Sequence, residues 1–198
     1  RALFGVPPGH MCIGSFQKDG VGWGEGLQPK LVKGPDLFIE AAGRLSKSFP
    51  VFALLTGPAR GYVKLGLERL GIPYRHVFLK DFREVAKAYH ALDLYLMTSR
   101  EEGGPKALLE SLASRVPLVT ANVGMAEDLF PDPNDPRRVP PEDVPALAAS
   151  AERLLADPEG TAKLAEAGRC LALNYAWDIV SKPLLEQVYL PLLQETRR

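Results

Sequence analysis

Several residue types are scarce in this 198-residue chain, and each scarcity excludes a class of protein. Two cysteines, Cys12 and Cys170, are too few for a disulfide framework or a cysteine-rich metal site. The three histidines, His10, His76 and His90, are not paired at the spacing of metal ligands. We therefore expect no bound metal, and we expect the histidines to be structural.

An excess of charge and a long hydrophobic run are also missing. The 24 lysines and arginines are balanced by 24 aspartates and glutamates. Because a general nucleic-acid binder needs a basic face, we expect no nucleic-acid partner. No apolar run reaches the roughly 18–20 residues of a membrane-spanning helix, and we recognise no signal peptide. We expect a cytoplasmic location, with any peripheral membrane contact made through a domain outside this chain.

The remaining composition is that of a globular protein, with 46% hydrophobic and 24% charged residues. This excludes a disordered tail, a collagen-like repeat and a coiled coil. The length suits one large domain that buries its own core. Because the chain begins at Arg1 rather than at methionine, it is either a mature product or a piece of a longer protein, and we expect the second.

Short apolar runs alternate with helical patterns through the first two thirds of the chain, and glycine and proline separate them. The predicted strands cover 11–15, 51–56, 75–79, 93–98 and 117–120, and the predicted helices cover 35–47, 62–70, 82–91, 105–114 and 126–130. This alternation predicts an α/β fold, with a Rossmann-like parallel sheet covered by helices on both faces.

The last third is rich in alanine and leucine and follows a turn-rich linker at 131–136. Its helical patterns cover 141–156, 158–174 and 177–193. We therefore predict a single domain over 1–198. Its α/β core occupies about 10–130 and its helical C-terminal extension about 141–195.

Polar or glycine-rich segments follow the predicted strands. They are Lys18 with the glycine-rich loop at 19–26, Lys33-Gly34 before the first helix, and the segments 100–105 and 120–124. Because ligands of such sheets bind beyond the carboxyl ends of the strands, we expect these segments to meet at one edge.

The segment before the helix at 105–114 carries the clearest chemistry. Gly103 and Gly104 precede the helix, where free backbone amides can bind an anion and glycine lets a phosphate approach. Glu102 and Glu110 can accept hydrogen bonds from the hydroxyls of a sugar or a ribose. Carboxylates for a polyol, with amides and lysines for a phosphate, are the groups that would bind a nucleotide sugar.

Each of these residues also has a simpler interpretation. Glu102 and Glu110 can be solvated charges at a helix start and on its face, and Lys18 and Lys33 can be surface lysines. The glycines at 19–26 can merely form a turn.

Other prominent side chains are equally open to two interpretations. Trp23 is either a lid residue or a local anchor. Arg60 either approaches a bound donor or is an exposed arginine at a helix start. We expect Arg137 and Arg138 to lie at the surface.

The ordered set of motifs resembles a known family. Residues 102–110 match its Glu-x7-Glu motif, 111–124 its helix, strand and glycine turn, 13–18 and 33–36 its basic segments, and 175–177 the aromatic start of its last helix. From about residue 10 to 190, the chain resembles the C-terminal, donor-binding half of a retaining GT-B glycosyltransferase of the family 4 type (glycosyl transferases group 1).

The resemblance implies a role for each matched residue. Glu102 would face the transferred hexosyl group as the catalytic residue, and Glu110 would bind the ribose. Lys18 and Lys33 would neutralise the diphosphate leaving group, an electrostatic form of catalysis. The donor would be a nucleoside-diphosphate sugar, with no metal and no other cofactor.

The same resemblance would place the amides of Gly103 and Gly104 near the sugar or the phosphates. The chain departs from the family at Ser15, where many members carry an arginine, and at Pro105, which lacks an amide donor.

The resemblance also implies a partner, an N-terminal GT-B domain that would bind a still unknown acceptor. Without that domain, we expect this chain to bind donor but to be inactive in transfer. Two alternatives stay open: a nucleotide-sugar epimerase or glycogen-synthase-like enzyme of the same architecture, and a non-catalytic binding module.

Overall fold

The computed structural model describes residues 1–195 and contains a six-stranded sheet in the order β3-β2-β1-β4-β5-β6. Every neighbouring pair of strands is parallel. The strands are β1 (Met11–Phe16), β2 (Val51–Thr56), β3 (Tyr74–Val77), β4 (Leu94–Met97), β5 (Leu118–Ala121) and β6 (Arg138–Val139). The predicted Rossmann-like α/β fold is therefore confirmed.

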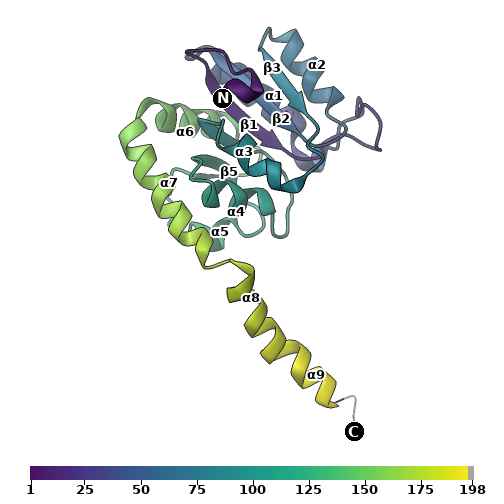
Figure 1. Cartoon of the computed structure of the whole chain (residues 1–198). Helices are drawn as coiled ribbons and strands as arrows, with labels where there is room; N and C mark the ends of the chain where they lie inside the picture. Colours follow the sequence, from purple (N-terminus) through teal and green to yellow (C-terminus); the bar gives the residue numbers. More distant parts are fainter. Residues whose placement is uncertain (196–198) are drawn as a thin grey trace.

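Helices cover both faces of this sheet (Figure 1). The helices of the α/β region are α1 (Pro35–Leu45), α2 (Gly61–Arg69), α3 (Val85–Tyr89), α4 (Lys106–Ala113) and α5 (Ala126–Leu129). The C-terminal third adds α6 (Val144–Ala156) and α7 (Pro158–Leu173). Apolar residues of α1, α2 and α6 share one core with Ile13, whereas those of α3, α4 and α5 share the other with Cys12. Neighbouring residues of β1 thus face opposite layers, as the two-residue period of a strand requires.

The structure differs from the sequence prediction in two places. The helix expected at 82–91 is present, but it begins as a 3-10 turn (Phe82–Glu84), capped by Asp81, which accepts a hydrogen bond from the Arg83 amide at 2.9 Å, and the short α3 that follows ends at Tyr89. The second difference is β6, which lies beyond the predicted α/β core, where no strand was expected. Its two residues are too few to produce a recognisable pattern.

The prediction that Arg137 and Arg138 lie at the surface was wrong. The Arg137 side chain is only 13% exposed and pairs with Asp135 at 2.6 Å. Its guanidinium lies 4.2 Å from the centre of the Phe130 ring. An ion pair and an aromatic face together compensate for the partial burial of this charge.

The last predicted helix, 177–193, is divided. It consists of α8 (Trp177–Leu184), a π-helical turn (Leu185–Tyr189) and α9 (Leu190–Glu195), and it projects away from the domain (Figure 1). Pro183 and Pro191 lack amide hydrogens, and each removes one regular helical hydrogen bond on either side of the π-helical turn. Among the helices that the structure describes, none has the length and apolar character needed to cross a membrane.

The strand order reverses between β1 and β4. In such sheets the crevice beyond the carboxyl ends of the two strands is where ligands bind. Gln17 and Lys18 follow β1 at this point, and the segment Thr98–Glu102 follows β4. The fold therefore brings two of the predicted segments to the same edge.

Candidate functional site

Lys33 and Glu102 are in direct contact at this edge, although they are 69 positions apart in sequence. The distance from Lys33 Nζ to Glu102 Oε1 is 2.6 Å, and the two side chains are 25% and 15% exposed. The Ser99 hydroxyl donates to the same carboxylate oxygen at 2.8 Å. The Glu102 carboxylate is therefore paired with the Lys33 ammonium group, and the Ser99 hydroxyl fixes its orientation.

The backbone around Lys33 is held tightly against the end of β4. Gly34 adopts a left-handed conformation with φ of 62°, and a Cβ atom there would overlap the Thr98 carbonyl. The Thr98 hydroxyl donates to the Gly34 carbonyl at 2.8 Å, and the Arg100 amide donates to the Val32 carbonyl at 2.8 Å. Only glycine permits this approach, and the approach brings Lys33 opposite Glu102.

Two pockets lie on either side of the segment Phe16–Lys18, which lines both. The Lys33 pocket has a volume of about 300 Å³ and is also lined by Lys30, Lys33, Tyr95, Met97, Glu102, Pro105, Lys106 and Ala107. The Glu110 pocket has a volume of about 260 Å³ and is also lined by Thr56, Gly57, Pro58, Phe78, Leu79, Phe82, Val85 and Glu110. The first is strongly basic, and the second is mostly apolar with one carboxylate.

Glu110 is oriented by a buried tyrosine. The Tyr89 hydroxyl donates to Glu110 Oε2 at 3.1 Å. Burial and the nearby carboxylate raise the pKa of Tyr89 far above its usual range, so this hydroxyl keeps its proton. The Tyr89 ring packs edge-on against Phe16 at 4.8 Å between ring centres. Tyr89 therefore fixes the positions of both the Glu110 carboxylate and the Phe16 ring, which line the same pocket.

Lys18 belongs to both pockets, but its ammonium group is not next to Glu102. Its Nζ lies 3.7 Å from the centre of the Trp23 ring, a cation–π contact. Trp23 is 82% exposed on the glycine-rich loop at 19–26. In this structure Trp23 therefore contacts a predicted phosphate-binding lysine and is not packed into the protein.

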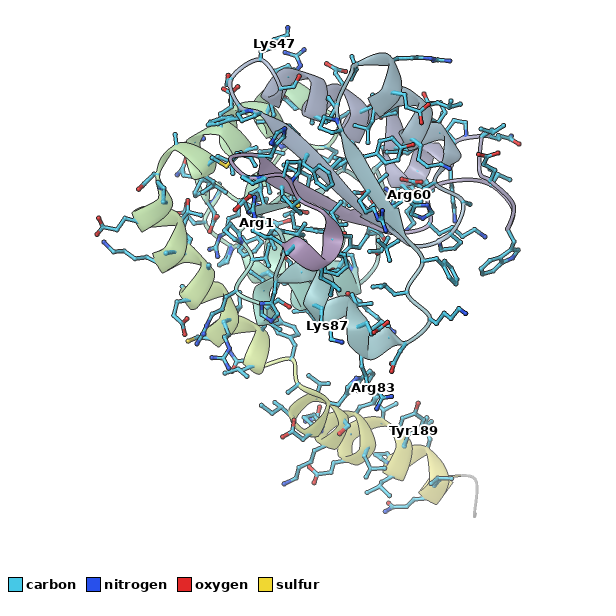
Figure 2. The ribbon with its side chains drawn as sticks, turned by 45° about the horizontal axis from the view of Figure 1, so that its top comes forward. Arg1, Lys47, Arg60, Arg83, Lys87 and Tyr189 are labelled. Carbon is cyan, nitrogen blue, oxygen red and sulfur yellow. The ribbon has the colours of Figure 1, made fainter. Side chains whose placement is uncertain are left out.

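The base of the glycine-rich loop contains a buried ion pair that the sequence analysis missed. Arg60 Nε lies 3.0 Å from Asp19 Oδ1, and neither side chain has any exposed surface. The guanidinium also donates to the carbonyls of Ser15, Gln17 and Thr56 at 2.7–2.8 Å. Both interpretations of Arg60 were wrong, because it neither faces a ligand pocket nor is exposed; it lies at the sheet edge beneath the loop (Figure 2).

Burying the charges of Asp19 and Arg60 is electrostatically unfavourable. Burial raises the pKa of the Asp19 carboxyl to about 6, although the neighbouring Arg60 acts in the opposite direction. Arg60 also donates to the Ser15 hydroxyl at 3.0 Å. The guanidinium thus reaches the position at which many family members carry an arginine, but it comes from the start of α2 instead of from β1.

The two glycines Gly103 and Gly104 are exposed in the loop before α4, and neither is among the lining residues of the two pockets. Within residues 1–195, their amides donate no hydrogen bond to the protein. Gly124, with φ of 57°, packs against the Gly103 carbonyl, where a Cβ atom would overlap it. The amides are accessible, and the loop is supported from the β5 side.

Several lining residues were not predicted. Phe78 and Phe82 are 64% and 70% exposed in the Glu110 pocket. They follow the carboxyl end of β3, so the reasoning applied to the other strands would have identified them. Ser99 and Gln17 have no comparable sequence signal, because their importance depends on contacts with Glu102 and with the Lys33 carbonyl.

Within the described part of the chain, no group of three or more histidine, cysteine, aspartate or glutamate residues is arranged to hold a metal ion. A need for a metal or a cofactor is not tested by this geometry, and its absence stays a prediction.

Comparison with known proteins places this geometry in a family context. A relative from Salinispora tropica named D-inositol 3-phosphate glycosyltransferase is 32% identical over 178 residues, which cover 81% of this chain and 36% of that protein. This chain therefore spans little more than a third of that relative. Two solved structures have the same fold. Sucrose-phosphate synthase from Thermosynechococcus elongatus has a TM-score of 0.79 and 21% identity, covering 98% of this chain and 48% of the other.

Anabaena HepE in complex with UDP-glucose has a TM-score of 0.72 and 21% identity, covering 93% of this chain and 49% of the other. The family model described as glycosyl transferases group 1 matches residues 28–170, which include Lys33, Glu102 and Glu110. The chain belongs to the group 1 glycosyltransferase family.

Proposed function

We propose that this chain is the donor-binding half of a retaining glycosyltransferase that transfers a hexosyl group from a nucleoside-diphosphate sugar to an acceptor. The observation that carries the proposal is the contact between Lys33 and Glu102 at the switch point of the sheet, between a basic pocket and an apolar one. A nucleotide sugar has the matching sequence of groups, with an aromatic base, a ribose, a diphosphate and a sugar.

The two pockets suggest how the donor is divided between them. The base lies in the Glu110 pocket against Phe78 and Phe82, and Glu110 binds the ribose hydroxyls. The diphosphate crosses the segment that ends at Lys18 and reaches Lys33, and the sugar faces Glu102. Phosphate then replaces Glu102 as a partner of Lys33, which frees the carboxylate to accept hydrogen bonds from sugar hydroxyls.

In the transfer step the bond between the sugar C1 and the diphosphate oxygen breaks, and a bond forms between C1 and an acceptor oxygen. The nucleoside diphosphate departs with the bonding electron pair, and the proton of the acceptor hydroxyl passes to the diphosphate oxygen that has just left C1. Lys33 and Lys18 stabilise the charge that develops on that leaving group. We also propose that the accessible amides of Gly103 and Gly104, on the loop that follows Glu102, are additional donors to the sugar or the phosphates.

Calorimetry on this chain tests donor binding directly, using UDP, GDP and their sugar conjugates as separate ligands. We expect one nucleotide class to bind, and we expect Lys33→Met and Glu110→Gln each to weaken it by about tenfold or more, since each removes a charged hydrogen-bonding partner. Lys47→Met is the matched control, because Lys47 is exposed on the turn after α1, at the opposite end of the strands (Figure 2). Absence of binding by every nucleotide at millimolar concentration would contradict the proposal.

The partner in transfer is the remaining part of the full-length protein, which we propose supplies the acceptor-binding domain. The projecting helix supports this, since Trp177, Leu185 and Tyr189 are 77%, 51% and 54% exposed along it. Tyr189 is labelled on this helix in Figure 2. Apolar residues at helical spacing are normally covered. A cytoplasmic location stays a prediction.

With the full-length enzyme, NMR analysis of the product distinguishes retention from inversion at C1. It also distinguishes transfer from epimerisation, which would release UDP and an altered sugar without an acceptor.

A further inference from the structure

Arg100 begins the segment 100–105, and the proposed function gives it no role. Its guanidinium forms a two-point interaction with Asp36 at the start of α1, with Nη1–Oδ1 at 2.9 Å and Nη2–Oδ2 at 2.7 Å. Nη1 also donates to the Leu31 carbonyl at 2.6 Å. Nε pairs with Glu142 from the segment before α6. One side chain therefore joins three separate parts of the chain.

These contacts lie on both sides of Lys33. Leu31 begins the 3-10 turn (Leu31–Lys33), and Asp36 lies in the first turn of α1. Arg100 thus holds the chain two residues before and three residues after Lys33. Its amide adds the bond to the Val32 carbonyl at 2.8 Å. Arg100 therefore holds the Lys33 backbone from both directions, in addition to the hydrogen bonds that Gln17 and Thr98 donate to the Lys33 and Gly34 carbonyls.

Arg100 is not itself placed to bind the donor. It is not among the residues that line the Lys33 pocket. Its charge is opposed by two carboxylates, and the guanidinium holds the pKa of Asp36 below its usual value. A guanidinium in a two-point ion pair is directional, which suits it to fixing a geometry.

The backbone of Glu142, just before α6, is strained at the point where its side chain meets Arg100. Glu142 has φ of 63°, a left-handed conformation that is unfavourable for a residue with a side chain. Its carboxylate nevertheless reaches Arg100. The beginning of the helical extension is thereby tied to the edge of the sheet at the same residue that holds the Lys33 segment.

We infer that Arg100 is a positioning residue that acts through Lys33, by holding residues 31–36 so that the Lys33 ammonium lies in the phosphate-binding pocket. The role in donor binding rests on the proposed function. The role in placing Lys33 opposite Glu102 does not, and it can be measured without any nucleotide.

A double-mutant cycle tests the part that concerns the ligand, with UDP or GDP, whichever binds the wild-type chain, as the probe. We expect Arg100→Gln to weaken nucleotide binding by about tenfold in the wild-type background and by less than about twofold in a Lys33→Met background. Arg100→Lys keeps the charge but loses the planar fork, so we expect only partial recovery. Arg44→Gln is the matched control, because Arg44 forms an exposed ion pair on α1 with Glu40.

NMR of ¹⁵N-lysine-labelled protein without nucleotide tests placement. We expect the side-chain ¹⁵Nζ–H signal of Lys33, assigned by its loss in Lys33→Arg, to be protected by the contact with Glu102 in the wild type and lost in Arg100→Gln. A folded Arg100→Gln protein, checked by circular dichroism, that keeps this signal would overturn the inference. Equal weakening of nucleotide binding in both backgrounds would also overturn it, since it would show a purely structural effect. If the wild type binds no nucleotide, the proposed function fails and the NMR result alone decides the placement role.

Discussion

The two basic segments at the edge of the sheet are built differently. The Lys33 segment (31–36) is held by backbone contacts to the end of β4 and by Arg100, and its lysine already touches the acid Glu102. The glycine-rich loop (19–26) is held near its two ends, and Val21 donates its amide hydrogen to the Gln28 carbonyl at 2.9 Å. Its tip carries Trp23, which is exposed and contacts Lys18.

The ends of the glycine-rich loop are nevertheless firmly attached. Asp19 pairs with the buried Arg60, and the carbonyls of Glu25 and Gly26 accept hydrogen bonds from the first amides of α2 at 2.7 and 2.9 Å. These bonds satisfy helix-terminal donors that otherwise lack partners. The comparison teaches that one lysine is pre-organised, whereas the other is attached to a stable base but free to change partner.

The largest expected effect comes from removing the base of the loop. Arg60→Gln leaves the buried carboxylate of Asp19 without its counter-charge, and we expect the free energy of unfolding to fall by about 3–5 kcal/mol. Denaturant unfolding measures it. Arg83→Gln is the control, since Arg83 also pairs with an aspartate but is 89% exposed, and we expect no measurable change. Equal effects of the two substitutions would show that burial of the Asp19 pair contributes nothing.

The next effect is a dependence of stability on pH, which has opposite signs in the loop and in the Lys33 segment. The folded-state pKa of Asp19 is raised from 3.8 to about 6, so the folded chain binds more protons than the unfolded chain between these values. Stability contributed at this site should therefore fall as pH rises from about 4 to about 6, by up to about 3 kcal/mol, since each pKa unit is worth about 1.4 kcal/mol. Asp36 acts in the opposite direction, because its pKa is lowered.

The measurement is the difference between the unfolding free energies of the wild type and Asp19→Asn across this pH range. Asp36 is present in both proteins, so its contribution cancels in the difference. A difference that is flat from pH 4 to pH 6 would show that Asp19 is not raised in the folded state.

A smaller effect is expected within the Lys33 segment. Gly34→Ala places a methyl group against the Thr98 carbonyl at a positive φ, and we expect a loss of about 1–3 kcal/mol together with weaker nucleotide binding. Gly103→Ala is the control, because a Cβ atom there meets nothing within 4 Å, and we expect a change within about 0.5 kcal/mol. If the two glycines tolerate alanine equally in unfolding experiments, the tight contact at Gly34 is not needed.

The smallest effect concerns Trp23. Its contact with Lys18 is worth about 0.5–1 kcal/mol at an exposed site, so a bound diphosphate should readily attract the ammonium group away. The chain has two tryptophans. In a Trp177→Phe background, we expect nucleotide binding to change the fluorescence of Trp23. Lys18→Met should remove that change. Emission that stays constant while calorimetry shows binding would mean that Lys18 does not exchange partners.

The sequence predicted the fold correctly, and it indicated a candidate site where regular apolar patterns lie next to charged or glycine-rich motifs. Alternating apolar runs predicted the parallel sheet, and the spacing of Glu102 and Glu110 drew attention to the helix that became α4. The reasoning failed for Arg60, because an arginine after a glycine-proline turn is normally solvated. Nothing local shows that the carbonyls of Ser15, Gln17 and Thr56 converge there.

The local sequence was therefore sufficient to predict that carboxylates, lysines and free amides gather at the carboxyl ends of the strands. Strand direction and the residues that follow each strand are local properties. The distance between Lys33 and Glu102, the role of Arg100 and the buried pair beneath the loop emerged only from the folded chain. Each depends on backbone atoms from segments that are remote in sequence, and packing alone sets how closely those segments approach.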